Sequence, residues 1–421
     1  MMPGRTGHPT QKTVYDVFVE RGFIEQVTDE EKLRDLLRGR TTCYIGFDPT
    51  ASSLHVGSLV PIMSLAHMQK HGHQPIALVG GGTGLVGDPS GKTEMRQILS
   101  LEEIEQNAEA QKKQFARFLD FSKEKALLLN NAAWLTKLNY IDFLRDVGVH
   151  FSVNRMLASE SVRIRLETGL SFIEFNYQLL QAYDFWHLFK HHACTVQMGG
   201  SDQWGNIVAG IDLIRRLEGK EAYGMTFPLI MTADGRKMGK TEKGAVWLDP
   251  ERTSPYDYYQ FWINTDGRDV TRFLALFTFL PMEEIREYGK FEGAELREVK
   301  EVLAFEATRI LHGKEEAEKA RNASRALFSG DEGDGSVPTT SMEKEAFAQG
   351  IPAFKLFEIT GLCSSGSEAR RLIDQGGGYL NKVRVEKSDL MIRVEDFSQK
   401  GEVLLRAGKK KFHRIRLLDK K

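Results

Sequence analysis

The 421-residue sequence has few cysteines and no long apolar segment. Its three cysteines, Cys43, Cys194 and Cys363, are far apart and form no CxxC pair, which argues against a zinc knuckle or a disulfide framework and fits a reducing cytosol. No run of 18 apolar residues is present, so we expect no membrane span. The start of the chain is polar and lacks an apolar signal core, so we expect a cytoplasmic protein and leave an organellar address open.

The net charge of −1 hides an uneven distribution. Residues 351–421 contain 16 Lys and Arg against 9 Asp and Glu, a balance of +7, so the preceding 350 residues carry −8 (−1 minus 7). A basic tail on an acidic body indicates a polyanionic partner for the tail. A basic surface that is merely solvated is the alternative.

Short β-rich runs alternate with helical stretches between residues 40 and 245. This alternation predicts a parallel sheet flanked by helices, the doubly wound α/β class. The predicted strands are 42–47, 75–79, 125–129, 195–198 and 226–231, and the predicted helices are 59–70, 104–119, 173–189 and 207–217.

Helical periodicity replaces the strand signals from about residue 254 to residue 328. Apolar residues spaced by threes and fours predict an amphipathic helix over 296–311. The segment SGDEGDGSVPTTS at 329–341 is rich in Gly, Ser and acid, which is typical of a linker. We therefore expect four parts: residues 1–250, a helical domain at 251–330, a linker at 331–350 and a basic domain at 351–421.

Two glycine-rich patterns come close to known nucleotide motifs. GTGLVG at 82–87 fits GxGxxG, but the DPSG that follows would interrupt the helix that a dinucleotide fingerprint needs, which disfavours a dehydrogenase. GDPSGKT at 87–93 has three residues between its glycines where a P-loop needs four. A substrate-binding loop is the better interpretation.

The segment PTASSLHVGS at 49–58 connects the first predicted α/β strand to a helix. His55 and Ser58 are expected on one side of the first helical turn, where the helix dipole favours phosphate. Gly57 lets the backbone approach a ligand closely. A histidine at a helix start is, taken alone, more often structural.

A second segment, residues 234–244, contains Lys237 and Lys240 among glycines after a strand. Such a loop is usually only a solvated turn. Together with His55 on the same sheet, the two lysines indicate a cationic clamp on a departing pyrophosphate.

These two segments resemble the HIGH and KMSKS signatures of class I aminoacyl-tRNA synthetases. The flanking sequences resemble tyrosyl-tRNA synthetases in particular, and the similarity extends over nearly the whole chain: YIGFDPT at 44–50, FNY at 175–177, QAYD at 181–184 and GGSDQWGN at 199–206. The resemblance implies a Rossmann-like catalytic domain, a small α-helical domain and a C-terminal α+β S4-like RNA-binding domain. It also implies a tyrosine–tRNA ligase that uses ATP with bound Mg²⁺, and no resident metal ion.

The resemblance assigns roles position by position. Tyr44 and Asp184 correspond to residues that bind the phenolic hydroxyl of tyrosine. Asp88, Tyr177 and Gln181 correspond to those that bind its α-ammonium group, and Gln197 also belongs to the tyrosine site. Groups assigned to ATP or the adenylate are Gly46, Asp48, Gly57, Gly200, Asp202, Gln203 and Lys240. Those assigned to catalysis are Thr50, His55, Ser58, Lys237, Thr241 and again Lys240, with Lys92 and Arg96 as pyrophosphate candidates.

Elementary chemistry agrees with these roles. Attack of a carboxylate on the α-phosphate needs no protein nucleophile, so catalysis is mainly alignment and stabilisation of phosphate charge. Selection of tyrosine over phenylalanine needs buried polar partners that lose their hydrogen bonds when the hydroxyl is missing. Two positions depart from the signatures: Ser58 replaces the last His of HIGH, and the second motif is KMGKT.

The basic tail resembles an S4-type RNA-binding domain, on the sequence SEARRLIDQGGGYLN at 367–381. Phosphate contacts from basic side chains give salt-dependent RNA affinity. The candidate RNA-binding residues are Arg370, Arg371, Lys382, Arg384, Lys409, Lys410 and Lys411.

The resemblance implies L-tyrosine, ATP and tRNA(Tyr) as partners, no membrane, and a homodimer in which one tRNA spans both subunits. The apolar-rich stretch 134–156 is our candidate for interface residues, and a core helix pair explains it about as well. Two alternatives stay open: the tryptophan enzyme, disfavoured by Tyr44, Asp184 and the tail, and a non-catalytic RNA-binding paralogue, which should have lost signature residues.

Overall fold

The computed structural model describes residues 12–90, 99–241, 244–293, 295–329, 337–381, 383–398, 401–408 and 411–418. The chain forms two compact units, Met1–Ala317 and Glu318–Lys421, which are described separately. In the described residues, no helix has the length and apolar character needed to span a membrane.

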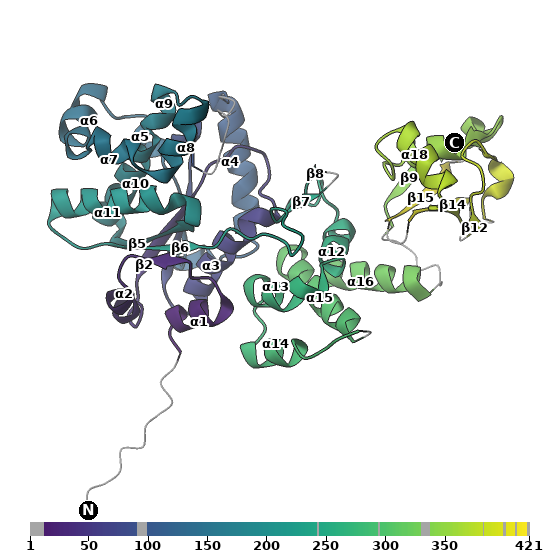
Figure 1. Cartoon of the computed structure of the whole chain (residues 1–421), viewed down its shortest axis with the longest axis horizontal. Helices are drawn as coiled ribbons and strands as arrows, with labels where there is room; N and C mark the ends of the chain where they lie inside the picture. The colour runs from purple at the N-terminus through teal and green to yellow at the C-terminus, as the bar shows by residue number, and fades with distance from the viewer. Residues whose placement is uncertain are drawn as a thin grey trace, which may run out of the picture. The chain divides into compact units, whose positions relative to one another are not determined.

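A six-stranded sheet forms the centre of the first unit, in the order β1-β6-β5-β2-β3-β4 (Figure 1). All pairings are parallel except that of the edge strand β1 with β6. The chain proceeds from β2 to one side through β3 and β4, and then returns to the other side of β2 with β5 and β6. The strands are β1 (Gln26–Val27), β2 (Thr42–Phe47), β3 (Gln74–Val79), β4 (Leu127–Asn130), β5 (Cys194–Gly200) and β6 (Tyr223–Phe227).

Helices cover both faces of this sheet, which confirms the doubly wound α/β class. Alternate side chains of the strands point to opposite faces, so Tyr44, Ile76 and Leu78 pack with Phe185 and Leu188 of α10 on one face. Figure 1 shows α10 and α11 on that side and α1 and α3 on the other. The helices up to this point are α1 (Val14–Arg21), α2 (Glu30–Leu36), α3 (Leu59–Lys70), α4 (Leu101–Phe115), α5 (Ala132–Leu135), α6 (Tyr140–Asp146), α7 (Val153–Leu157), α8 (Glu160–Thr168), α9 (Phe172–Phe175), α10 (Tyr177–His192) and α11 (Trp204–Glu218).

Several predicted elements differ from the structure at their ends. The helix predicted over 173–189 is two helices, α9 and α10, which meet at Asn176. The strand predicted over 226–231 lies earlier, as β6 at 223–227, and Pro228 follows it without a backbone N–H to continue the ladder. The helix predicted over 104–119 begins three residues earlier, because Ser100 and Glu103 form a capping box at its start.

Helices dominate the rest of the first unit, as predicted. The hairpin β7 (Lys240–Thr241) and β8 (Gly244–Ala245) precedes them. Residues 251–317 belong to the same compact unit as the sheet, because this unit extends to Ala317, within α16. The domain boundary at residue 250 stays a prediction. The helices are α12 (Pro255–Ile263), α13 (Val270–Phe277), α14 (Met282–Tyr288), α15 (Leu296–His312) and α16 (Lys314–Ser329).

The second unit is built on a five-stranded sheet in the order β12-β11-β14-β15-β9. Its core contains Leu356 and Ile373 from two helices and Leu405 and Ile415 from two strands. Besides a short β10 (Ile351–Pro352) and β13 (Met391–Ile392) pair, its elements are β9 (Thr339–Glu343), α17 (Ala353–Ile359), α18 (Gly366–Asp374), β11 (Gly378–Leu380), β12 (Val383–Arg384), β14 (Glu402–Ala407) and β15 (Lys411–Leu418).

The linker predicted at 331–350 is too long at its C-terminal end. Strand β9 pairs in parallel with β15, and Phe347 is fully buried in the core of the second unit. In the strand TTSME, the partly buried residues Thr340 and Met342 alternate with exposed ones. This short alternation follows directly on Gly- and Ser-rich sequence, so the composition predicts a linker there.

Candidate active site

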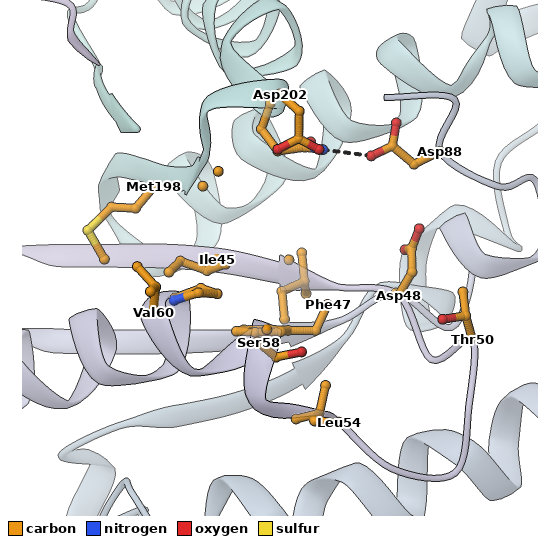
Figure 2. A pocket seen from close by; sticks show the side chains of 18 of the residues that line it. Ile45, Phe47, Asp48, Thr50, Leu54, Ser58, Val60, Asp88, Met198 and Asp202 are labelled. Atoms are coloured by element: carbon orange, nitrogen blue, oxygen red, sulfur yellow. Dashed lines mark hydrogen bonds between the residues drawn. The ribbon is translucent and has the colours of Figure 1, made fainter. Parts of the chain in front are cut away.

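A cavity of about 580 Å³ opens at the carboxyl ends of the parallel strands of the first unit (Figure 2). It lies where the chain reverses direction across the sheet, between β2 and β5, and ligands of doubly wound sheets bind at such switch points. Fourteen of the predicted site residues line it: Tyr44, Gly46, Asp48, Thr50, His55, Gly57, Ser58, Asp88, Tyr177, Gln181, Asp184, Gly200, Asp202 and Gln203.

The deep end of the cavity has polar groups that a buried hydroxyl would satisfy. Tyr44 on β2 is 1% exposed, and within the described residues its hydroxyl has no hydrogen-bond partner. The same holds for Oε1 of Gln197, whose backbone pairs in register with Tyr44 although its side chain is not part of the cavity lining. Buried polar atoms without partners are costly, so the Tyr44 hydroxyl, which lines the cavity, fits a site for a polar ligand group.

Asp184 on α10 is held in a fixed orientation at this end. Its Oδ1 accepts a hydrogen bond of 2.7 Å from Nε1 of Trp134, and its Oδ2 accepts one of 2.8 Å from Nδ2 of Asn131. Burial raises the pKa of Asp184 to about 7, although both hydrogen bonds act in the opposite direction. The carboxyl group therefore changes charge near neutral pH.

A second carboxylate, Asp48, lies at the end of β2 in the middle of the cavity. Its two oxygens accept hydrogen bonds from the hydroxyls of Tyr177, at 3.0 Å, and of Thr83, at 2.8 Å. Thr83 in turn accepts a hydrogen bond of 3.0 Å from Nδ2 of Asn131. One chain of hydrogen bonds therefore joins Asp48 to Asp184.

Asp88 faces the cavity from the other side, opposite Asp48 in Figure 2. Nε2 of Gln203 donates to its Oδ2 at 2.8 Å, the bond that is dashed in Figure 2, and the backbone N–H of Ser90 donates to its Oδ1 at 2.9 Å. Burial, and next the charge of Asp48, raise the pKa of Asp88 to about 6. Asn206 links Gln203 to Gln181 by two further hydrogen bonds.

Acidic side chains predominate around the cavity. Within the described part of the chain, the lining includes the carboxyl groups of Asp48, Asp88, Asp184 and Asp202 but no Lys or Arg. Carboxylates that raise one another's pKa favour a bound cation, which would relieve their repulsion. An ammonium group fits this arrangement, and phosphate groups need positive charge from outside the lining.

The predicted segment at 49–58 runs along the mouth of the cavity. It ends in a single 3-10 turn, Val56–Ser58, before α3 begins, so His55 precedes the helix proper. Nδ1 of His55 accepts a hydrogen bond of 3.0 Å from the backbone N–H of Gly57. A Cβ on Gly57 would lie 2.6 Å from the imidazole ring and 3.2 Å from the carbonyl oxygen of Met238, so only glycine fits between them.

The glycine–lysine loop lies against the same segment. Gly239 has a φ of +82°, and a Cβ there would lie 3.0 Å from the backbone nitrogen of Gly57. Lys237 is exposed beside it, outside the cavity lining. For Lys240 and Thr241 only the backbone is described, as strand β7, and Lys92 and Arg96 lie outside the described residues.

The GxGxxG-like sequence at 82–87 does not begin a long helix. Residues Thr83–Leu85 form a single 3-10 turn after β3, and Asp88 then points into the cavity. A dinucleotide fingerprint needs an α-helix at this point. The dehydrogenase interpretation therefore has no support in the local structure.

Sequence reasoning missed three side chains that hold the site together, namely Thr83, Asn131 and Trp134. Asn131 directly follows β4, and a polar residue at the carboxyl end of a parallel strand indicates a site residue. Trp134 carried no such signal, because its contact with Asp184 depends on how α5 and α10 pack.

The candidate RNA-binding residues belong to the second unit. Arg370 and Arg371 on α18 and Arg384 on β12 are exposed, as is Lys411 on β15. The guanidinium of Arg370 stacks on Phe354 at 3.6 Å, and that of Arg406 stacks on Tyr379 at 3.7 Å. Lys382, Lys409 and Lys410 lie outside the described residues.

Comparison with known proteins gives one consistent result. Residues 37–329 match the family described as class I tRNA synthetases (W and Y). The tyrosine–tRNA ligase of Syntrophus aciditrophicus is 59% identical over 96% of this chain and 99% of its own length, and that of Caldanaerobacter subterraneus is 55% identical over 96% and 99%. The solved structure of a C-terminally truncated mitochondrial tyrosyl-tRNA synthetase from Aspergillus nidulans is 32% identical, with a TM-score of 0.69 over 76% of this chain and 95% of that one.

Proposed function

The chain belongs to the tyrosine–tRNA ligases of the class I aminoacyl-tRNA synthetases, and from this premise we propose how its residues bind tyrosine and ATP. The reaction activates L-tyrosine with ATP to tyrosyl-adenylate and pyrophosphate, and then transfers the tyrosyl group to the 3′ end of tRNA(Tyr). The proposal concerns the role of each side chain.

Tyr44 and Asp184 bind the phenolic hydroxyl of tyrosine, with Gln197 behind them. The observation that carries this assignment is the unpartnered hydroxyl of Tyr44 beside a carboxyl group whose orientation is already fixed. A carboxylate accepts the substrate's O–H, and the hydroxyl of Tyr44 donates or accepts. Phenylalanine would leave these buried groups unpaired, at a cost in free energy.

Asp88, Tyr177 and Gln181 bind the α-ammonium group. This assignment is supported by the excess of carboxyl groups in the cavity, because a cation near Asp88 would offset the charge of Asp48, which raises the pKa of Asp88. Binding of the ammonium group therefore favours the charged form of Asp88.

The nucleotide binds at the strand ends and the mouth of the cavity. Gly46, Gly57 and Gly200 allow close approach of the ligand, and Asp48, Asp202 and Gln203 supply polar contacts. Thr50 and His55 contact the γ-phosphate, with a contribution from Ser58. Lys237 and Lys240 of the glycine–lysine loop neutralise the remaining charge, and Thr241 offers a hydroxyl, with Lys92 and Arg96 as further pyrophosphate ligands.

ATP enters with Mg²⁺ in this proposal. The described lining offers the phosphates carboxylates and no Lys or Arg, so positive charge has to come with the nucleotide or from the loop. Mg²⁺ commonly binds substrate phosphates and one or two carboxylates while it keeps several waters. It supplies charge neutralisation, and the protein side chains align the tyrosine carboxylate with the α-phosphate.

The second unit binds tRNA through its exposed arginines. Arg370, Arg371 and Arg384, with Lys382, Lys409, Lys410 and Lys411, supply phosphate contacts whose affinity falls with salt. We assign residues 251–330 to the anticodon side of the tRNA.

The protein acts as a cytoplasmic homodimer, away from membranes. The support is a set of apolar side chains on α6 to α9 and the turns between them that are largely exposed in the single chain: Tyr140, Ile141, Val149, Val153, Leu166 and Phe172. Exposed apolar surface of this kind marks an interface. This group extends beyond the stretch 134–156 named from the sequence, and sedimentation at several protein concentrations tests it.

Amino-acid-dependent ATP–pyrophosphate exchange with Mg²⁺ tests the substrate assignment. Tyrosine, phenylalanine and tryptophan are compared side by side, and we expect exchange with tyrosine alone. Exchange with tryptophan would contradict the roles of Tyr44 and Asp184. No exchange with any of them, in a folded protein that still binds tRNA, would instead indicate a non-catalytic RNA-binding paralogue.

A further inference from the structure

The segment that follows the glycine–lysine loop forms a strap across the signature segment that contains His55. The backbone N–H of Val56 donates to the carbonyl of Val246 at 2.9 Å, and that of Leu248 donates to the carbonyl of Leu54 at 2.9 Å. His55 and Trp247 thus form an antiparallel bridge between two segments nearly 200 residues apart in sequence. The strap, residues 245–253, is a fixed neighbour of His55.

The same strap also holds the loop. The backbone N–H of Val246 donates to the carbonyl of Gly239 at 3.0 Å, and β8 pairs with β7. The loop residues before it touch Gly57. The backbone that carries Lys237 and Lys240 is therefore connected to His55 through residues 245–247.

The side chain of Trp247 lies between His55 and an arginine. Its ring meets the imidazole edge-on, with centroids 6.2 Å apart and an interplanar angle of 77°. The guanidinium of Arg252 lies 3.5 Å above the Trp247 ring, and Nη1 of Arg252 donates to Oγ of Ser52 at 3.3 Å. Trp247 lines the cavity, whereas Arg252 does not.

An exposed imidazole needs such a neighbour to keep one orientation. The torsion that rotates a histidine ring has broad minima, so its orientation is set by contacts. The hydrogen bond from Gly57 fixes one nitrogen of His55, and the Trp247 ring limits rotation from the other segment. Catalysis by alignment is sensitive to this, because a displacement of about 1 Å can cost about 100-fold in rate.

We propose that Trp247 is a positioning residue that orients His55 for the ATP-dependent step, and that Arg252 acts through Trp247 by fixing its ring. The proposal rests on the assignment of His55 to the ATP site. Neither residue needs to touch tyrosine, since the hydroxyl and ammonium ends of the cavity are built from other segments.

The test measures single-turnover formation of tyrosyl-adenylate by the full-length chain as a function of ATP, with tyrosine saturating. Trp247→Leu should lower the rate about 10- to 100-fold, as expected for a misaligned group. Arg252→Met should lower it about two- to fivefold, the range for loss of a cation–π contact at an exposed site. Equilibrium binding of tyrosine should stay within about twofold of the parent, because its proposed contacts are untouched.

The double variant distinguishes action through Trp247 from direct action on a ligand. If Arg252 acts only by fixing the ring, Arg252→Met has no further effect once Trp247→Leu is present. An undiminished effect of Arg252→Met in that background would mean that Arg252 contacts ATP or RNA itself, and it would overturn the proposal.

Three controls complete the design. Trp247→Phe keeps an aromatic ring and should restore most of the rate lost in Trp247→Leu. Lys190→Met removes a cation that lies 4.9 Å from the ring of Trp186, the same kind of contact elsewhere in the unit, and should leave the rate unchanged. Thermal unfolding of every variant separates a folding defect from a misaligned site.

His55→Ala separates failure of this proposal from failure of the role given to His55. If His55→Ala slows adenylate formation and Trp247→Leu does not, the positioning role is wrong and the role of His55 stands. If His55→Ala has the parental rate, the assignment of His55 to ATP fails, and the positioning role fails with it.

Discussion

At the scale of single residues, Asn131 makes more contacts in the site than its place in the sequence indicates. Its Oδ1 accepts from the backbone N–H of Gly82 at 2.7 Å, and its Nδ2 donates both to Thr83 and to Asp184. The side chain is 1% exposed and uses both N–H bonds. It therefore sets the relative positions of the hydroxyl-binding carboxyl group and, through Thr83, of Asp48.

Replacing Asn131 with alanine should weaken use of tyrosine. A hydrogen bond to a charged group contributes about 1.5–3 kcal/mol, so kcat/KM for tyrosine in pyrophosphate exchange should fall about 10- to 100-fold. Asn264→Ala is a suitable control, because Asn264 donates to the carbonyl of Gln260 at the exposed end of α12 and is not part of the cavity lining. That variant should lose some thermal stability and keep its kcat/KM, and a parental value for Asn131→Ala would remove Asn131 from the site.

The titration of Asp184 predicts a pH dependence of tyrosine binding. Its pKa is raised to about 7 without ligand, so the group is half protonated there and charged above. A bound hydroxyl donor favours the charged form and lowers this pKa, so affinity for tyrosine should rise from about pH 6 to about pH 8 and then level off. Isothermal titration calorimetry measures the profile.

Asp184→Asn is the variant that isolates this effect. The pKa of Asp88 is raised to about 6, so it contributes in the same direction at the lower end of the range. The variant should keep that part of the profile and become flat above about pH 7. An unchanged slope there would mean that another group titrates.

The sequence motifs named residues that the structure brings to one cavity, whereas they missed several of the side chains that join one element to another; the roles of the named residues stay predictions. Tyr44, Asp48 and His55 lie on or next to β2, and the structure brings them to one cavity with Asp184 from α10. Thr83 and Trp247 could not be placed in advance, and the contacts of Asn131 were missed although it follows a strand end. Their partners depend on which strand lies beside β3 and on where a distant loop returns.

At the scale of elements, apolar runs that end at turn residues gave the most accurate boundaries. The helix 59–70 and the strand 42–47 have the predicted bounds, since most residues of each are buried and turn residues follow both. Helices α5 to α7 were not predicted, because each has four to seven residues and, in α6 and α7, several apolar side chains face outward. Two turns of helix are too short to show a period.

One buried arginine joins the N-terminal helix α1 to the helical region after the sheet. Arg21 is 7% exposed, and its guanidinium donates to the carbonyls of Ala275, Thr278 and Leu280 at the end of α13. Burial lowers its pKa, so the group is held there at a cost in hydration. The last carbonyls of a helix need such donors when water is excluded.

Arg21→Met should therefore destabilise the first unit. Three carbonyl groups lose a donor, while the cost of burying the charge disappears, so we expect a net loss of about 2 kcal/mol in the free energy of unfolding. Denaturant unfolding followed by circular dichroism measures it. Arg286→Met is the control, because Arg286 makes an exposed ion pair with Glu20 and should change stability by less than about 1 kcal/mol. Equal losses in both variants would contradict the role of Arg21.

At the scale of the whole molecule, the proposed roles in tyrosine activation and in tRNA binding fall in different units. Every described residue that lines the cavity lies between Tyr44 and Trp247 of the first unit, and the exposed arginines of α18 and β12 lie in the second. Tyrosine activation needs the cavity, whereas capture of tRNA needs basic surface. The charge asymmetry of the sequence already indicated this division.

A chain that ends after Ser329 should keep activation and lose charging. ATP–pyrophosphate exchange with tyrosine should stay within about twofold of the full chain, because all described residues of the cavity lining belong to the first unit. Aminoacylation of tRNA(Tyr) should fall by at least about tenfold, and more at higher salt, since several phosphate contacts are removed. Loss of exchange in a folded truncated chain would show that the second unit contributes to the cavity.

The parallel pairing of β9 with β15 has a consequence for synthesis of the chain. β9 is made first, and its partner begins 68 residues later (411 minus 343). At about 5–20 residues per second, the ribosome needs several seconds to reach β15, and during this time β9 lacks the strand with which it pairs. A chain that stops before β15 also leaves one edge of β14 open and Val403 and Leu405 without a completed core. A nascent or prematurely terminated chain thus presents an aggregation-prone surface that quality-control proteases can recognise, while the first unit is already folded.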